Sequence, residues 1–402
     1  MSTAESFSPP RPDTEWMGSL LAELSSIHRP SASTGERRAA EWITARFEEL
    51  GAEARIESER AHGTYWWPLG IGAAAGALAN FAALRGKRLT ATALGAVAGA
   101  ALVDEFPPGK RRLRNRLVNG HTYNVVCELG PPDAERTVVV VSHHDAAHSG
   151  LIFHPAIPET IFRRWGVPIE KFDTSPPLMW PLLASPALAA AAGLTGKRGL
   201  AKLGAFLGSA YAAAMAEIGS REVVPGANDN ATGVILLFAL ARRLLEDPTS
   251  STRVILLSTG SEESFSEGMK AFGERHFDEL PRESTFFLVV DTLGSPKLNV
   301  LRGEGFVHMH EYPADALALI DGLAEELGIE MVPNLRLRNG TDGLEPLAAG
   351  YKTVALCSCT ELKQPANYHW PTDVAENVDL DTVADAVRLS EALIRRLDER
   401  WL

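Results

Sequence analysis

Four short apolar runs constrain the fold of this chain more than any other feature. They are YNVVCEL (123–129), TVVVVS (137–142), VILLSTG (254–260) and FFLVVDTLG (286–294). Runs this short and this apolar are typical of strands buried on both faces of a sheet. Segments 34–51 and 231–247 have the apolar spacing of helices. Strands that alternate with helices predict an α/β sandwich with a central, largely parallel sheet.

Acidic and imidazole side chains gather where these strands are expected to end. Three of the runs finish in such residues, and two further groups stand in the loops PGANDNATG and NYHWPTD. Ligands of such sheets bind at the carboxyl ends of the strands, so we expect these side chains to meet in one pocket. The set comprises His143, Asp145, Asp229, Glu262, Glu263, Asp291 and His369.

This inventory suits a pair of zinc ions, which bind imidazole nitrogen and carboxylate oxygen and leave a position open for water. Two metals close together need a bridging carboxylate, and the short Asp229 at a helix start is well placed for that role. Of the adjacent Glu262 and Glu263, one can ligate while the other acts as general base. Asp145 lies two residues after His143 and can accept a hydrogen bond from its imidazole.

Simpler structural roles are open to the same residues. They are a strand-end histidine for His143, a helix cap for Asp229, an acidic turn for Glu262 and Glu263, and a turn for Asp291. His308 and His310 compete with His369 for the last ligand position. We expect His144 and His148 to support or line the pocket.

The motifs SHHD, PGANDNATG, GSEES, VVDTLG and YHWPTDVAENVD resemble, in order and rough spacing, those of the M28 family of dizinc aminopeptidases. The resemblance runs from about Trp16 to the C-terminus, apart from two apolar inserts. It implies a central mixed sheet of about eight strands flanked by helices. It also implies two Zn²⁺ ions and the hydrolysis of a peptide or amide next to a free amine.

The resemblance further implies a role for each residue. His143 and Asp291 would complete one zinc site and Glu263 and His369 the other, with Asp229 bridging both. Glu262 would be the general acid/base, and Asp145 would orient His143. The chain departs from the family near its last quarter, because Gly343 stands where His is common. That departure leaves the role of the matching Asp342 open.

Other functions remain open to the same residues. A glutaminyl-cyclase-like acyltransferase resembles this family but uses one zinc. An amidase or carboxypeptidase acting on a non-standard amide is a further alternative. A membrane receptor or scaffold with an inactive hydrolase domain would not need the full ligand set.

Composition limits the kinds of binding partner and the cellular compartment that the chain is expected to have. The net charge of −12 argues against nucleic acid, whose phosphates need a basic surface. The three cysteines, Cys127, Cys357 and Cys359, are too few for a disulfide framework and predict reduced thiols. The first residues lack a basic segment followed by an apolar core, so we expect no cleavable signal peptide.

Two apolar inserts, 63–105 and 176–219, divide the expected catalytic domain into 1–62, 106–175 and 220–402. Each reads as an apolar segment, a basic turn and a second apolar segment, which predicts a helical hairpin. Such hairpins suit insertion into a membrane, and equally an interface between copies of a soluble protein.

The basic residues beside the first insert predict its orientation. Five of them in GKRRLRNR (109–116) outnumber three in RGKR (85–88), which predicts a membrane-associated protein with a cytoplasmic catalytic domain. A soluble cytoplasmic protein is the alternative.

Overall fold

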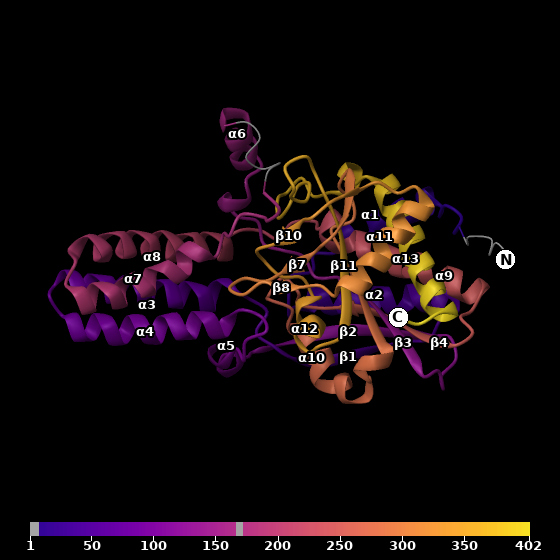
Figure 1. The fold of residues 1–402 in the computed structure, drawn as a ribbon, viewed down its shortest axis with the longest axis horizontal. Coiled ribbons are helices and arrows are strands. Elements are labelled where there is room, and N and C mark those ends of the chain that lie inside the picture. The colour runs from indigo at the N-terminus through magenta and orange to yellow at the C-terminus, as the bar shows by residue number, and fades with distance from the viewer. Residues whose placement is uncertain (1–7, 166–171) are drawn as a thin grey trace.

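The computed structural model describes residues 8–165 and 172–402. Its centre is an eight-stranded sheet of order β1-β2-β4-β3-β5-β11-β6-β9 (Figure 1). The four central strands, β4, β3, β5 and β11, run parallel to one another, and antiparallel pairs lie toward both edges. The predicted α/β class with a mixed, mostly parallel sheet is confirmed. The strands are β1 (Ala54–Ala61), β2 (Gly120–Leu129), β3 (Arg136–His143), β4 (Thr252–Thr259), β5 (Thr285–Asp291), β6 (Lys297–Val300), β9 (Met331–Val332) and β11 (Lys352–Cys359).

Helices cover both faces of this sheet. Side chains of β3 alternate between two cores: Val138 and Val140 join the first, Val139 and Val141 the second. The first core lies under α1 (Thr14–Ser25), α2 (Thr34–Leu50), α9 (Thr232–Glu246), α11 (Ala314–Leu327) and α13 (Leu380–Glu399). The second lies under α10 (Glu267–His276), α12 (Leu344–Ala348) and a small sheet of β7 (Gly303–Glu304), β8 (His310–Glu311) and β10 (Arg336–Leu337). The short helices are α5 (Arg112–Arg116), α6 (Ala156–Trp165), η1 (Leu151–Phe153), η3 (Ala227–Ala231), η4 (Phe277–Glu279), η5 (Arg282–Ser284) and η6 (Ala375–Asn377).

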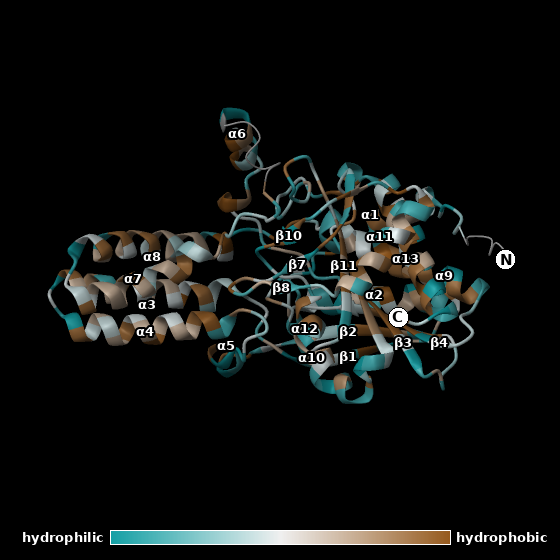
Figure 2. Cartoon of the chain, viewed as in Figure 1, coloured by the Kyte–Doolittle hydropathy of each residue, from teal (hydrophilic) through white to brown (hydrophobic). Residues whose placement is uncertain are grey.

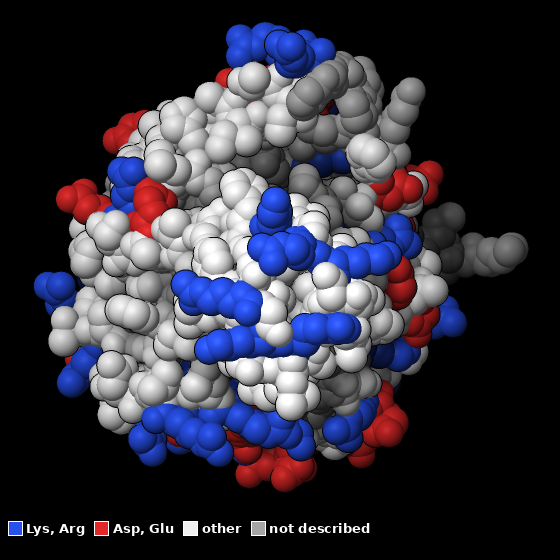
Figure 3. All heavy atoms as spheres, turned by 90° about the vertical axis from the view of Figure 1, so that its left-hand side faces the viewer, with Lys and Arg blue, Asp and Glu red and all other residues white. Residues whose placement is uncertain are grey.

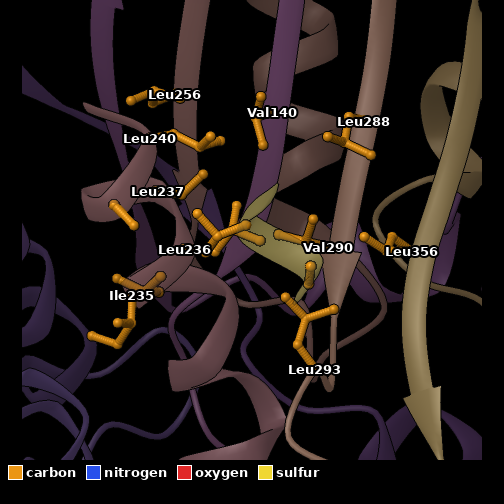
Figure 4. Packing of buried hydrophobic residues seen from close by; sticks show 14 of the residues in the cluster. Val140, Ile235, Leu236, Leu237, Leu240, Leu256, Leu288, Val290, Leu293 and Leu356 are labelled. Atoms are coloured by element: carbon orange, nitrogen blue, oxygen red, sulfur yellow. The ribbon is translucent and has the colours of Figure 1, made fainter. Parts of the chain in front are cut away.

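Local sequence signals explain the predicted helices. The helix expected over 34–51 is α2, whose start is capped by the Ser33 hydroxyl, which accepts from two backbone N–H groups. It ends at Gly51, where φ is +91°, a conformation that favours glycine. The helix expected over 231–247 is α9. Figure 4 shows its apolar residues packed against Val140, Leu256 and Leu288 of the sheet.

The two apolar inserts form helices that pack into one four-helix bundle, which projects away from the predicted catalytic domain (Figure 1). We call α3 (Trp66–Leu84), α4 (Arg88–Glu105), α7 (Trp180–Thr195) and α8 (Arg198–Gly219) the helical bundle. Glycines allow the helices to approach closely. A Cβ atom on Gly72 would lie 2.4 Å from Leu102, and one on Gly204 would lie 2.3 Å from Asn80. The sequence predicted two hairpins, but not that they pair with each other.

An apolar cluster joins the base of the helical bundle to the predicted catalytic domain. Phe106, which follows α4, stacks on Phe306 with ring centroids 5.0 Å apart, and Tyr65 stacks on Phe265 at 5.4 Å. Beside this cluster, the buried Arg114 forms an ion pair with Glu105 at 3.1 Å. The base is therefore packed against the domain rather than linked to it by loops alone.

The same junction buries charges on which the predicted orientation depends. Arg111 is buried and pairs with Glu345. Arg111 and Arg114 are two of the five basic residues counted in 109–116. The folded protein therefore presents fewer free charges there than the sequence suggests, and the cytoplasmic placement of the catalytic domain stays a prediction.

Candidate metal centre

The strands deliver most of the predicted site residues to one edge of the sheet. His143 is the last residue of β3, and Asp291 is the last residue of the neighbouring parallel strand β5. Glu262 and Glu263 follow the end of β4. Because the carboxyl ends of parallel strands share an edge, residues far apart in the sequence arrive together.

Two loops complete the group. Asp229 lies in η3, immediately before α9, and His369 lies in the loop after β11. Close packing fixes the first of these loops, because a Cβ on Gly226 would lie 2.6 Å from the Asp229 carbonyl oxygen. Gly226 also has a φ of +65°, which favours glycine.

The carboxylate of Asp229 lies between the two imidazoles. Its Oδ1 is 3.2 Å from His143 Nε2, and its Oδ2 is 3.2 Å from His369 Nε2. Glu263 Oε2 is 3.1 Å from the same His369 nitrogen. The structure thus brings together all five residues predicted as metal ligands.

Ligand atoms fall into two groups that share Asp229. His143, Asp229 and Asp291 form one, and Asp229, Glu263 and His369 form the other, with the atoms of each within 4.8 Å of one another. A third combination joins His143 to Glu262 and Glu263. The first two groups divide the residues as the family resemblance implies.

Buried polar atoms in the site fit bound cations. Within the described part of the chain, His143 Nε2, Asp229 Oδ2 and Glu263 Oε1 are buried without a hydrogen-bond partner. Such atoms are rare in folded proteins, because losing water without gaining a partner is costly. Imidazole nitrogen and carboxylate oxygen are the donors that Zn²⁺ takes. The residues present therefore fit a zinc centre.

The carboxyl groups also indicate that positive charge belongs in the site. Burial raises the pKa of Asp291 to about 8. Burial also raises the pKa of Glu262 well above its usual value, and the charge of Glu263 adds to the rise although His143 opposes it. A bound cation reverses this effect, since it stabilises the carboxylate form.

Asp145 connects His143 to the two glutamates. Its carboxylate lies 3.4 Å from His143 Nδ1 and accepts from the backbone N–H groups of Glu262 at 2.9 Å and Glu263 at 3.1 Å. It also accepts from the Ser31 hydroxyl at 2.6 Å. Asp145 therefore lies where the predicted orienting residue should be, and it holds the glutamate loop as well.

Asp373 supports the bridging loop in a way that the sequence did not reveal. Its carboxylate accepts from the backbone N–H groups of Asn228 at 2.7 Å and Asp229 at 3.1 Å. It stands four residues after His369, in the same motif. Asp373 thus ties the loop that carries Asp229 to the motif that contains His369.

Arg29 is a second supporting residue that sequence reasoning missed. Its guanidinium is fully buried and donates to the backbone carbonyls of His144, Pro225 and Gly226, each at 2.6 Å. Burial lowers its pKa to about 10, so the group stays charged at neutral pH. Arg29 therefore ties the loop after His143 to the loop before Asp229.

The remaining histidines lie outside the three ligand groups. His144 is buried with its Nδ1 2.9 Å from the Ser258 hydroxyl, and burial lowers its pKa to about 3, which keeps it neutral. His148 packs on Trp66, with ring centroids 4.4 Å apart. His308 and His310 pack on each other at β8, with ring centroids 5.0 Å apart.

The other residues of open role are buried. Asp342 accepts a hydrogen bond from the Thr259 hydroxyl at the end of β4, close to the site. Cys357 and Cys359 are free thiols at the end of β11. Neither thiol belongs to a ligand group among the described residues.

Metal binding is expected to release protons at neutral pH. Although burial alone would lower it, the carboxylates of Glu263 and Asp229 raise the pKa of His369 to about 10 in the metal-free protein. Although burial would lower it, the neighbouring carboxylates of Asp145 and Asp229 also raise the pKa of His143 well above its usual value. Both imidazoles therefore carry a proton at pH 7, whereas a metal needs the neutral ring.

The apparent zinc affinity should accordingly rise with pH toward about 10, the pKa of His369. Calorimetry of zinc binding at pH 7, in buffers of different ionisation enthalpy, measures the number of protons released. At least one proton per chain is expected. An identical heat in every buffer would contradict these protonation states.

Comparison with known proteins agrees with this geometry. Residues 209–394 match the family model of peptidase family M28, a range that contains every predicted ligand except His143. No curated protein sequence matches the chain.

Solved structures with a similar fold cover nearly the whole chain. A glutaminyl cyclase of Bacteroides thetaiotaomicron has 12% identity and a TM-score of 0.56, covering 96% of this chain and 98% of its own. A Zn-dependent exopeptidase from Parabacteroides distasonis ATCC 8503 has 10% identity and a TM-score of 0.53, covering 97% and 98%. An aminopeptidase from Aneurinibacillus sp. strain AM-1 has 14% identity and a TM-score of 0.55, covering 96% and 94%. The resemblance to peptidase family M28 is thus confirmed, by the family model over residues 209–394 and by a shared fold over nearly the entire chain.

Proposed function

We propose that the chain is a metallo-aminopeptidase that holds two zinc ions and removes N-terminal residues from peptides or related amides. The observation that carries this proposal is the carboxylate of Asp229, which turns one oxygen toward each of two imidazoles. A single metal would need only one of these two ligand groups. The zinc-dependent exopeptidase and the aminopeptidase among the structural neighbours support the same reaction class.

Glu262 is the residue best placed to move protons. When bound, a pair of zinc ions acidifies a water molecule and polarises the carbonyl under attack. Glu262 Oε2 lies 4.0 Å from His143 Nε2, at the edge of the ligand groups. In the proposed role its carboxylate accepts the proton of the attacking water and returns it to the leaving amine. Asp145 holds the backbone of Glu262 in place during this exchange.

Amide substrates with and without a free amine test the proposal. Aminoacyl amides should be hydrolysed and their N-acetylated counterparts left intact. A chelator should abolish turnover, and added Zn²⁺ should restore it. Hydrolysis of the N-acetylated amides alone, or release of C-terminal residues, would instead assign the amidase or carboxypeptidase function.

A glutaminyl-cyclase-like acyltransferase is the second candidate, because a glutaminyl cyclase shares the fold over 96% of the chain. A peptide that begins with Gln separates the two reactions, since an aminopeptidase frees glutamine and a cyclase forms a pyroglutamyl peptide. Zinc content per chain gives an independent answer. We expect two ions, because two ligand groups share Asp229.

A further inference from the structure

All four helices of the bundle expose large apolar side chains. A soluble protein rarely leaves a continuous apolar surface of this kind uncovered. Figure 2 shows that apolar residues extend along the length of the bundle and that polar ones gather at its outer turns. The exposed residues are Trp67, Ile71, Leu78 and Phe81 on α3, Leu89, Val97 and Val103 on α4, Trp180 and Leu194 on α7, and Leu203 and Phe206 on α8.

The apolar surface has nearly the thickness of a bilayer core. α3 has 19 residues without a charge and is therefore about 28 Å long, against about 30 Å for the hydrocarbon of a membrane. Among the described residues, α3 is the single helix long and apolar enough to cross a membrane by itself; α7 is apolar but shorter. A crossing would therefore depend on the four helices acting as one unit.

Charged and aromatic side chains mark the two ends of this surface. Figure 3 looks onto the outer tip, where Lys and Arg side chains gather. The two turns there, 85–88 and 195–199, carry five exposed basic residues and no acidic one. At the opposite end, Trp67 and Trp180 are 62% and 46% exposed. Basic residues suit anionic headgroups, and tryptophan is enriched at membrane interfaces.

Asn80 and Ser185 point inward, and their donor groups find partners inside the bundle, although Asn80 Oδ1 is buried without a hydrogen-bond partner. Asn80 is buried and its amide donates to the carbonyls of Gly76 at 2.8 Å and Ser185 at 2.9 Å. The Ser185 hydroxyl donates to the Gly204 carbonyl at 2.9 Å. An apolar groove of about 130 Å³ between α3 and α4 opens outward beside Ile71 and Val97. Small residues and a few polar groups thus lie inside the bundle, and large apolar side chains lie outside, as suits helices packed in lipid.

We propose that the helical bundle spans a lipid bilayer, with its basic tip among anionic headgroups on one side and the catalytic domain on the other. An interface between two copies of the chain would cover one side of the bundle. Because every helix of the bundle exposes apolar residues, the bundle needs an apolar environment on all sides, which a bilayer provides. In a dimer, the basic tip of one copy would also find no opposite charge on the basic tip of the other.

The proposal places the metal centre near a membrane surface. Trp66, the first residue of α3, packs on His148 in the loop that follows β3. Phe265, two residues after Glu263, belongs to the apolar cluster at the base of the bundle. The loops that carry the metal ligands therefore contact the base of the bundle, the end opposite its basic tip.

Membrane fractionation tests whether lipid surrounds the helical bundle. The full chain should stay in the membrane pellet after an alkaline carbonate wash and leave it only in detergent. The Leu78→Arg and Val97→Arg double variant should reduce the carbonate-resistant fraction at least tenfold, because arginine is costly inside a bilayer. The matched control is Leu245→Arg, at an exposed position near the end of the otherwise buried α9, which should leave that fraction unchanged. A detergent-free, lipid-free monomer or dimer in the supernatant would overturn the proposal.

Cysteine labelling tests whether the bundle crosses, without depending on the arginine variants. The three native cysteines are buried, so an introduced one can be labelled selectively. Lys87→Cys at the tip and Glu48→Cys on α2 should differ in reaction with a membrane-impermeant maleimide added to intact cells. The cytoplasmic placement predicts labelling of Lys87→Cys alone. Labelling of Glu48→Cys alone supports the crossing with the opposite orientation, and equal labelling of both overturns it.

Discussion

Turnover of the Glu262→Gln variant is expected to fall about 10²–10⁴-fold while the zinc content stays at the wild-type value. The amide keeps the size of the side chain but cannot accept a proton at neutral pH. The carboxylate of Glu262 lies at the edge of the ligand groups, 4.0 Å from His143 Nε2, so its loss should leave the two main groups intact. Steady-state kinetics on an aminoacyl amide, together with metal analysis of the same sample, measures both effects.

Glu263→Gln is the matched control, because it alters the adjacent carboxyl group. Glu263 lies 3.1 Å from the His369 imidazole, within one ligand group. This variant should lose zinc as well as turnover. If Glu262→Gln keeps both its turnover and its zinc, the proton-transfer role belongs to another group. If it loses zinc, Glu262 is a ligand, as the third combination of residues allows.

Replacing Arg29 with Met is expected to lower the free energy of unfolding by about 3–5 kcal/mol. Three of the backbone carbonyls to which the guanidinium donates lie at 2.6 Å, and each of these that is buried and left without a donor costs about 1–3 kcal/mol. The three do not add fully, because the loops can relax. Urea unfolding in the presence of a chelator measures the change without a contribution from metal binding.

Arg37→Met controls for the loss of an arginine as such. Arg37 is exposed and forms an ion pair with Glu41 one helical turn away, at 2.9 Å. Its replacement should change the unfolding free energy by less than about 0.5 kcal/mol. A similarly small change for Arg29→Met would show that the buried guanidinium does not hold the two loops together.

The sequence predicted the sheet because its central strands are buried on both faces. In a run such as that of β3, both faces of the strand are apolar, so both must be buried. The strand can therefore be recognised from its composition alone. The small sheet of β7, β8 and β10 was not predicted. Its strands have two residues each, too few for any periodicity to emerge.

The metal centre was predictable because its residues stand at strand ends and in short motifs. Arg29 was not, because nothing in the neighbouring sequence tells a buried guanidinium from an exposed one. Three of the carbonyls that it binds belong to residues more than 100 positions away. Asp373 was visible in its motif, but its bonds to the backbone of Asn228 and Asp229 depend on the folded loops.

The pairing of the two hairpins also depends on contacts that no local pattern records. Each insert shows small residues at helical spacing, which predicts close packing without naming a partner. In the structure, Gly204 of α8 lies against Asn80 of α3, and Gly95 of α4 lies against Pro186 of α7. These long-range contacts determine that the two hairpins form one four-helix bundle rather than two separate hairpins.

The discontinuous origin of the helical bundle sets an order for its assembly during translation. α7 begins roughly 75 residues after α4 ends, which at typical synthesis rates is roughly 4–15 s on the ribosome. For that interval the glycine-lined sides of α3 and α4 lack the helices that will cover them. Because the same interval produces β2 and β3, the nascent chain must keep an unfinished sheet and an unfinished bundle apart. A pause or a chaperone acting before residue 180 would therefore affect both halves of the molecule at once.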